Sequence, residues 1–242
     1  IERIGMRALG KKSLSSPEWI GLKVALTGAV DADARYVMVD EVQDYTEAQL
    51  TVLARYFKNA NFLLLGDPNP AINEGTASWG KIREVFERCR GEVAECELMT
   101  SYRSSPEITT LFTSLMDPDE RLKTNSVQRP GIEPVVQAYE DKTTWETVLK
   151  GAVHDAIERK ELAAVVAADK QSLKALAKLL ADEEVELMDG SRKLPESGVV
   201  LLDVGLAKGL EFDEVIIPDA IAAIYRDTQV CRHRLYTAMS RA

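Results

Sequence analysis

The 242-residue sequence has few cysteines, no long apolar run and no excess of positive charge. Its three cysteines, Cys89, Cys96 and Cys231, lack the number and spacing of a disulfide framework or a zinc ribbon, and they favour a reducing, cytoplasmic setting. No stretch approaches about eighteen apolar residues, which excludes a membrane span. The net charge of −9 excludes a surface that is basic throughout, so any contact with nucleic acid must use a local positive groove.

What is present is typical of a soluble globular protein, with 45% hydrophobic and 29% charged residues. The length predicts one large domain or two modest ones. The first residue is Ile1, and the last, Ala242, falls inside an expected helix. We therefore expect a fragment of a larger protein.

Two apolar runs in the first half, residues 36–39 and 62–65, end in acidic or turn residues, as buried parallel strands do at their carboxyl edge. Thr46 and Gln49 have the spacing of a capping box and predict a helix start. A further helix is expected over residues 79–90, then a strand near 97–99, then a helix that begins at Ser105-Pro106. Residues 1–35 are too weakly periodic for an assignment.

The second half alternates regularly between strand and helix patterns. We expect helices over 144–159 and 171–182 and strands over 135–139, 163–167, 185–188, 199–203 and 214–218. This order predicts a covered, mainly parallel sheet and an α/β fold of the RecA or Rossmann kind.

Several polar groups follow the expected strands, where ligands of α/β sheets collect. Asp40 and Glu41 could divide the work of a nucleotide hydrolase, with Asp40 holding Mg²⁺ and Glu41 accepting a proton from water. The alternative is an acidic turn that ends a strand. Asp67 fits a second polar loop beside the same site, or an ordinary Gly-Asp-Pro turn.

The second half offers three more candidates. Tyr102 and Arg103 could stack on a base and reach a phosphate, although such pairs are frequent on surfaces. In the segment 207–213, Lys208 supplies a charge, Gly209 permits a tight turn and Glu211 could bind ribose hydroxyls; a solvated loop is the alternative. Arg241, near the end of an expected helix, is either an arginine finger or a residue that favours the helix dipole.

The order of these segments carries more information than any one of them. Asp-Glu-x-Gln-Asp, Gly-Asp-Pro-Asn, Ser-Tyr-Arg-Ser, Ala-Lys-Gly-Leu-Glu-Phe-Asp and Leu-Tyr-Thr-Ala-x-Ser-Arg-Ala follow one another over residues 40–242. This series resembles motifs II to VI of UvrD/Rep-like superfamily 1 helicases, in particular the helicase IV, or HelD-like, branch. Some members of that branch act on DNA, and others release RNA polymerase from stalled complexes.

The resemblance implies two RecA-like lobes, an incomplete first lobe over 1–100 and a second over 101–242, with ATP in the cleft between them. It makes Asp40 the Mg²⁺ ligand and Glu41 the catalytic base, and it assigns the link from the γ-phosphate to lobe movement to Gln43 and Asp67. In the second lobe, the resemblance implies that Tyr102 packs on adenine and that Glu211 binds the ribose. Lys208 and Gly209 would belong to the nucleotide-binding loop. Arg103 and Arg241 would stabilise the transferring phosphoryl group.

Three departures from the family pattern matter. The phosphate-binding loop G-x-x-x-x-G-K-[ST] is absent, so we expect it upstream of Ile1 and expect the fragment alone to be inactive. Pro70 stands where the family usually has Gln, and Asp203 and Gly205 stand where it usually has Thr and His that face nucleic acid. Only 105 residues separate Arg103 from Lys208, which predicts a compact second lobe.

Two functions follow from these expectations. The first is the carboxy-terminal motor portion of an ATP-driven helicase or translocase on single-stranded DNA. The alternative is an ATP-driven factor that remodels RNA polymerase, which the acidic charge and the missing His favour. A module without nucleotide chemistry, whose motifs are relics, is the third hypothesis.

Overall fold

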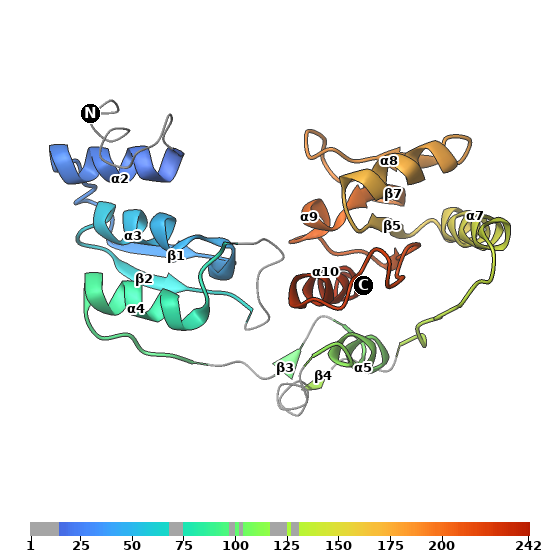
Figure 1. Cartoon of the computed structure of the whole chain (residues 1–242), viewed down its shortest axis with the longest axis horizontal. Helices are drawn as coiled ribbons and strands as arrows, with labels where there is room; N and C mark the ends of the chain where they lie inside the picture. The colour runs from blue at the N-terminus through green and yellow to red at the C-terminus, as the bar shows by residue number, and fades with distance from the viewer. Residues whose placement is uncertain (1–14, 68–74, 97–99, 102–103, 117–124, 127–130) are drawn as a thin grey trace. The chain divides into compact units, whose positions relative to one another are not determined.

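In the computed structural model the chain folds into two compact units, Ile1–Cys96 and Glu97–Ala242. The sequence placed the boundary between residues 100 and 101. The structure describes residues 15–67, 75–96, 100–101, 104–116, 125–126 and 131–242 (Figure 1).

The first unit has a short parallel sheet and three α-helices among its described residues. Its elements are α2 (Ser16–Thr27), β1 (Tyr36–Val39), the 3-10 turn η1 (Val42–Asp44), α3 (Glu47–Tyr56), β2 (Asn61–Leu64) and α4 (Trp79–Arg90). The expected capping box is confirmed, because the Thr46 hydroxyl accepts the Gln49 N–H and the Gln49 side chain returns to the Thr46 N–H. The two strands pair in parallel, with Val39 opposite Leu64.

Among the residues that the structure describes, helices cover one face of this sheet. Val39 on that face packs with Leu50 of α3 and with Phe86 of α4. On the opposite face, Tyr36 is 79% exposed and Met38 is 68% exposed. The prediction of a buried strand is therefore wrong for half of β1, since a run of four apolar residues does not reveal whether one or both faces of the sheet are covered.

The second unit is built around a four-stranded parallel sheet with strand order β6-β7-β5-β8. Its strands are β5 (Leu162–Ala167), β6 (Val185–Leu187), β7 (Gly198–Asp203) and β8 (Glu214–Ile216). Its helices are α5 (Pro106–Thr113), α7 (Lys142–Arg159), α8 (Lys170–Leu179), α9 (Val204–Ala207) and α10 (Gln229–Met239). The short strands β3 (Thr100–Ser101) and β4 (Asn125–Ser126) pair separately.

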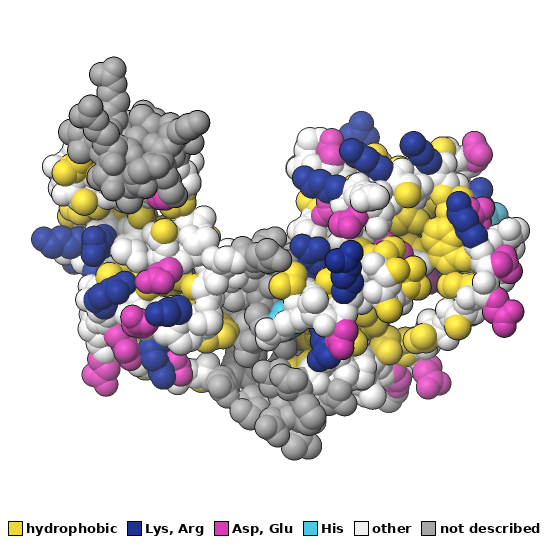
Figure 2. All heavy atoms as spheres, viewed as in Figure 1, with side chains coloured by type: hydrophobic (Ala, Val, Ile, Leu, Met, Phe, Trp, Pro, Cys, Tyr) yellow, Lys and Arg dark blue, Asp and Glu magenta, His cyan; other side chains and the backbone are white. Residues whose placement is uncertain are grey.

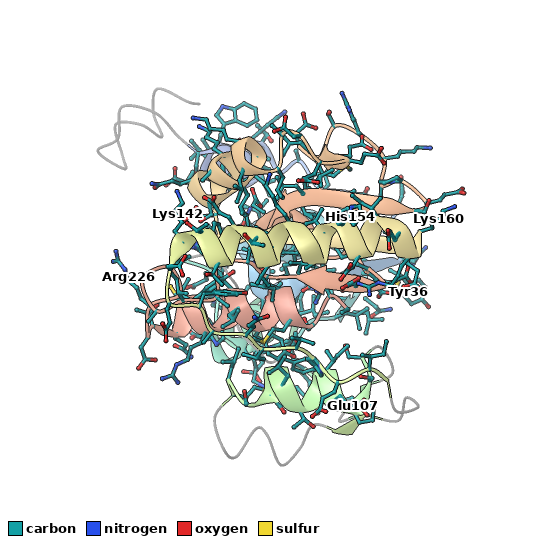
Figure 3. The ribbon with its side chains drawn as sticks, turned by 90° about the vertical axis from the view of Figure 1, so that its right-hand side faces the viewer. Tyr36, Glu107, Lys142, His154, Lys160 and Arg226 are labelled. Carbon is teal, nitrogen blue, oxygen red and sulfur yellow. The ribbon has the colours of Figure 1, made fainter. Side chains whose placement is uncertain are left out.

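The central strands β5 and β7 are buried on both faces, as their continuous apolar runs predicted. Val165 and its same-face neighbours pack against α7 and α8, whereas Val166 and Val200 face α9 and α10. Figure 3 shows α7 along one face, with Lys142 and Lys160 at its opposite ends. The α/β class with parallel sheets is confirmed, because the strands pair in parallel and helices cover both sides of the sheet.

One predicted strand is wrong. Residues 135–139 form no strand, and Val135 and Val136 are exposed. Hydrophobic side chains line this extended segment between α5 and α7 (Figure 2). A β-branched run favours extended backbone, but it forms a strand only where another strand offers hydrogen bonds. The strand expected near 97–99 lies outside the described residues.

The end of the chain packs on α5. The rings of Phe112 in α5 and Tyr236 in α10 meet edge to face, with centroids 5.0 Å apart. The Ser104 hydroxyl, just before α5, donates to the carbonyl of Ala242 at 3.1 Å. None of the helices in the described ranges has the length and apolarity that a bilayer crossing needs.

Candidate functional site

The first unit holds one group of candidate residues, which lies where β1 and β2 end side by side. The backbone ladder continues beyond both strands, because Leu65 donates to the Val39 carbonyl at 2.8 Å and Val42 donates to the Leu65 carbonyl at 2.9 Å. Residues 40–43 are thereby held beside residues 65–67. The sequence predicted this proximity from the rule that parallel strands deliver their carboxyl ends to one edge.

Asp40 and Glu41 form a tight acidic turn at this edge. The Asp40 side chain is exposed, and its Oδ1 accepts the Glu41 N–H at 2.8 Å. Glu41 has φ +49°, in the left-handed region that costs a non-glycine residue on the order of 1–2 kcal/mol. The surrounding bonds compensate for this strain and fix the direction in which the two carboxylates leave the backbone.

Gln43 connects Glu41 to the second strand end. Its side chain is 3% exposed, and its Nε2 donates to Glu41 Oε2 at 2.6 Å. Its Oε1 is buried and has no hydrogen-bond partner among the residues the structure describes. A Cβ added at Gly66 would overlap this oxygen, so only glycine permits so close an approach.

Asp67 has a contact that the sequence did not predict. Its backbone carbonyl accepts the indole N–H of Trp79 at 3.1 Å, and the Trp79 ring also lies against Gly66. The indole therefore holds the Gly66-Asp67 turn against Gln43. The sequence marked Trp79 only as the first residue of an expected helix, and nothing in that pattern indicated this contact.

The segment 208–213 of the second unit is tied to the chain end. Lys208 ends the short helix α9, Gly209 adopts φ +83° and Glu211 is exposed. The N–H of Phe212, the residue after Glu211, donates to the Arg241 carbonyl at 2.9 Å. The structure thus brings together Glu211 and Arg241, two candidates far apart in the sequence.

Arg241 lies just after α10, at the helix end where both interpretations of this residue placed it. Its side chain is 8% exposed, with Nε donating to the Thr237 carbonyl at 3.2 Å and Nη2 to the Ser240 hydroxyl at 3.1 Å. These bonds satisfy the end of α10, as a basic residue does at a helix C-terminus. Burial of the guanidinium against its own helix is not encoded in the residue type.

Asp203 and Gly205 both belong to the turn at the start of α9, and this turn accounts for both residue types. The Asp203 carboxylate caps α9 by accepting the Leu206 N–H at 3.0 Å. A Cβ at Gly205 would lie 3.1 Å from Asp203 Oδ1, so a small residue suits this turn. Tyr102, Arg103 and Pro70 lie outside the described residues.

Each unit is thus a parallel α/β structure with its own polar groups, at the carboxyl edge of the sheet in the first unit and near the chain end in the second. Residues 198–242 match the family described as the UvrD-like helicase C-terminal domain. The second unit thus carries a UvrD-like helicase C-terminal domain, and the matched stretch includes Lys208, Glu211 and Arg241.

Comparison with solved structures finds a similar chain, the C-terminal domain of a possible DNA helicase from Lactobacillus plantarum WCFS1. It is 30% identical over 59% of this chain and 82% of that chain, with a TM-score of 0.46. A comparison with curated proteins found no match.

Proposed function

We propose that this chain is the carboxy-terminal motor portion of an ATP-dependent superfamily 1 DNA helicase or translocase, which moves on single-stranded DNA. The observation that carries the proposal is the Glu41–Gln43 pair at the strand edge of the first unit. Glu41 has a strained backbone, and its carboxylate accepts a hydrogen bond from the buried amide of Gln43. The oxygen of that amide has no hydrogen-bond partner among the described residues. Such strain is typical of functional sites.

The first unit fits a metal-bound nucleotide. Asp40 presents an exposed carboxylate, a ligand that suits Mg²⁺ because this ion keeps several waters. When bound, Mg²⁺ would neutralise charge on the phosphates. Glu41 would accept the proton of the attacking water, and Gln43, held by Gly66, would fix the direction of the Glu41 carboxylate. Asp67, in the neighbouring turn, would help to link the γ-phosphate to movement of the lobes.

The second unit would supply the remaining contacts. We propose that Tyr102 packs on adenine, that Glu211 binds the ribose, and that Arg103 and Arg241 stabilise the transferring phosphoryl group. Lys208 and Gly209 belong to the same nucleotide-binding set. The bond from Phe212 to Arg241 supports a joint role, because movement of the 208–212 loop would displace the chain end.

Replacement of Glu41 tests this function in the full-length protein. Glu41→Gln should lower ATP turnover by about 10²–10⁴-fold, since general bases contribute about that much, and should leave ATP binding detectable. Glu47→Gln is the matched control, because Glu47 is an exposed acid at the start of α3 in the same unit. Normal turnover by Glu41→Gln would refute the assignment of the base.

The alternative partner is RNA polymerase. Asp203 uses its carboxylate as a helix cap and Gly205 has no side chain, so neither offers a nucleic-acid strand a hydrogen-bond donor. Basic and acidic side chains are interspersed on the face drawn in Figure 2. Turnover should be measured with single-stranded DNA and, separately, with RNA polymerase. Strong stimulation by DNA alone would exclude the alternative, and stimulation by the polymerase alone would exclude the DNA motor.

A further inference from the structure

A buried acid lies at the carboxyl edge of the second sheet, outside the proposed nucleotide site. Asp219 follows β8 and is 6% exposed. Within the described part of the chain, neither of its carboxylate oxygens has a hydrogen-bond partner. The preceding carbonyl, of Pro218, accepts the indole N–H of Trp145 at 2.6 Å, which fixes this turn on α7. The carboxylate is therefore held in place without a partner for its charge.

A second buried polar group lies beside it. The Tyr225 side chain is 9% exposed, and its hydroxyl likewise lacks a partner among the described residues. Two backbone hydrogen bonds link the two residues. The Ile221 N–H donates to the Asp219 carbonyl at 2.7 Å, and the Tyr225 N–H donates to the Ile221 carbonyl at 2.8 Å. Burial raises the pKa of Tyr225, and the nearby Asp219 charge raises it further.

The surrounding charges are mainly negative. Asp169, which caps α8, adds a second carboxylate near Asp219 and Tyr225. From α10, Arg234 and the Cys231 thiol act on Tyr225. Ser172 and the Ala168 backbone lie near Asp219 and partly offset the rise of its pKa that burial causes, but neither completes a hydrogen bond with it. The negative charges of the Asp169 and Asp219 carboxylates thus exceed the single positive charge of Arg234.

An ionised carboxylate in such a place is costly unless a cation compensates it, by several kcal/mol in folded proteins. A buried polar group without a protein partner is a position that an ordered water or an ion can complete. Asp219 and Tyr225 are each less than one-tenth exposed, which leaves no access for a nucleotide or a partner's side chain. Oxygen atoms from carboxylates and hydroxyls suit hard metal ions.

We propose that Asp219, with the hydroxyls of Tyr225 and Ser172, forms a binding site for one hard divalent cation. This site is separate from the Mg²⁺ position at Asp40, which belongs to the other unit. Groups of three or more His, Cys, Asp or Glu side chains placed for a metal do not occur in the described ranges. The site therefore relies on the single carboxylate of Asp219 and on two hydroxyls, with water completing the shell. Arg226, the neighbour of Tyr225, lies at the Lys142 end of α7 (Figure 3).

The experiment uses Mn²⁺ as the probe, because its unpaired electrons broaden nearby NMR signals. The chain has three tryptophans, Trp19, Trp79 and Trp145. Trp145 contacts Pro218 beside Asp219, and Trp79 contacts Asp67 at the first site. On titration of the wild-type chain we expect the Trp145 indole signal to broaden at a fraction of one equivalent of Mn²⁺. In Asp219→Asn it should stay sharp, with one bound Mn²⁺ fewer by electron paramagnetic resonance.

Asp182→Asn is the matched control, because Asp182 is an exposed acid in the same unit. It should bind Mn²⁺ as the wild type does. Should Asp219→Asn fail to fold, Tyr225→Phe keeps the carboxylate and should weaken binding about tenfold. The proposal is overturned if wild-type Trp145 stays sharp under saturating Mn²⁺, or if Asp219→Asn retains the broadening. A Trp145 signal that stays sharp would indicate that Asp219 is protonated or binds water instead of a metal ion.

Discussion

Gly66 provides the sharpest test of how the first site is built. An alanine Cβ there would overlap Gln43 Oε1, and it would lie 3.1 Å from Val42 Cγ1 and 3.2 Å from the Trp79 ring. Val42 is fully buried and cannot yield easily, so the Gln43 amide has to move. That movement breaks its 2.6 Å bond to Glu41.

The magnitude follows from two effects. Overpacking of a tight interior costs about 1–3 kcal/mol. A hydrogen bond to a charged group contributes about 1.5–3 kcal/mol, reduced here because the half-exposed Glu41 can bond to water instead. We therefore expect Gly66→Ala to destabilise the first unit by about 2 kcal/mol, roughly a 30-fold change in its unfolding equilibrium.

Urea unfolding measured by Trp79 fluorescence is the assay, because Trp79 contacts the substituted position. Gly80→Ala is the matched control: a Cβ there meets nothing within 4 Å, and alanine in place of glycine favours a helix by up to about 1 kcal/mol. The double variant Gly66→Ala with Gln43→Ala should recover part of the loss. If Gly66→Ala is as stable as Gly80→Ala, the account of the Gly66–Gln43 contact is wrong.

Three other predictions concern the second unit. Arg241→Ala should lower its stability by about 1–3 kcal/mol, because the buried guanidinium bonds the end of α10, and thermal unfolding of Arg241→Ala that matches wild type would contradict this. Asp203→Ala should cost about 1 kcal/mol by removing the cap of α9, whereas Asp203→Asn should cost much less in the same measurement. Burial raises the pKa of Asp219 above its ordinary value of 3.8, so its stabilising contribution is complete below that pH and is lost as the pH rises through the folded-state pKa. In metal-free buffer Asp219→Asn should therefore gain stability over wild type as the pH rises, and a gap that stays constant would refute it.

Helices with strong caps and regular apolar spacing could be predicted from the sequence. α3 begins after Thr46 as its capping box indicated, and α7 and α4 lie close to their expected ranges. By contrast, α2 was not predicted, although Ser15 and Glu18 form a capping box at its start. It buries none of its residues, so its apolar side chains follow no helical stripe.

The sequence alone determined the parallel α/β class, the run of motif residues and their gathering at strand ends, since apolar periodicity and strand direction are local properties. Only the tertiary structure decided which apolar strands are covered on one face or two, and that Arg241 turns back onto α10. It alone placed in the interior the oxygens of Gln43 and Asp219 that find no hydrogen-bond partner within the described ranges. Burial and pairing depend on residues distant in the chain, whereas a sequence pattern records only near neighbours.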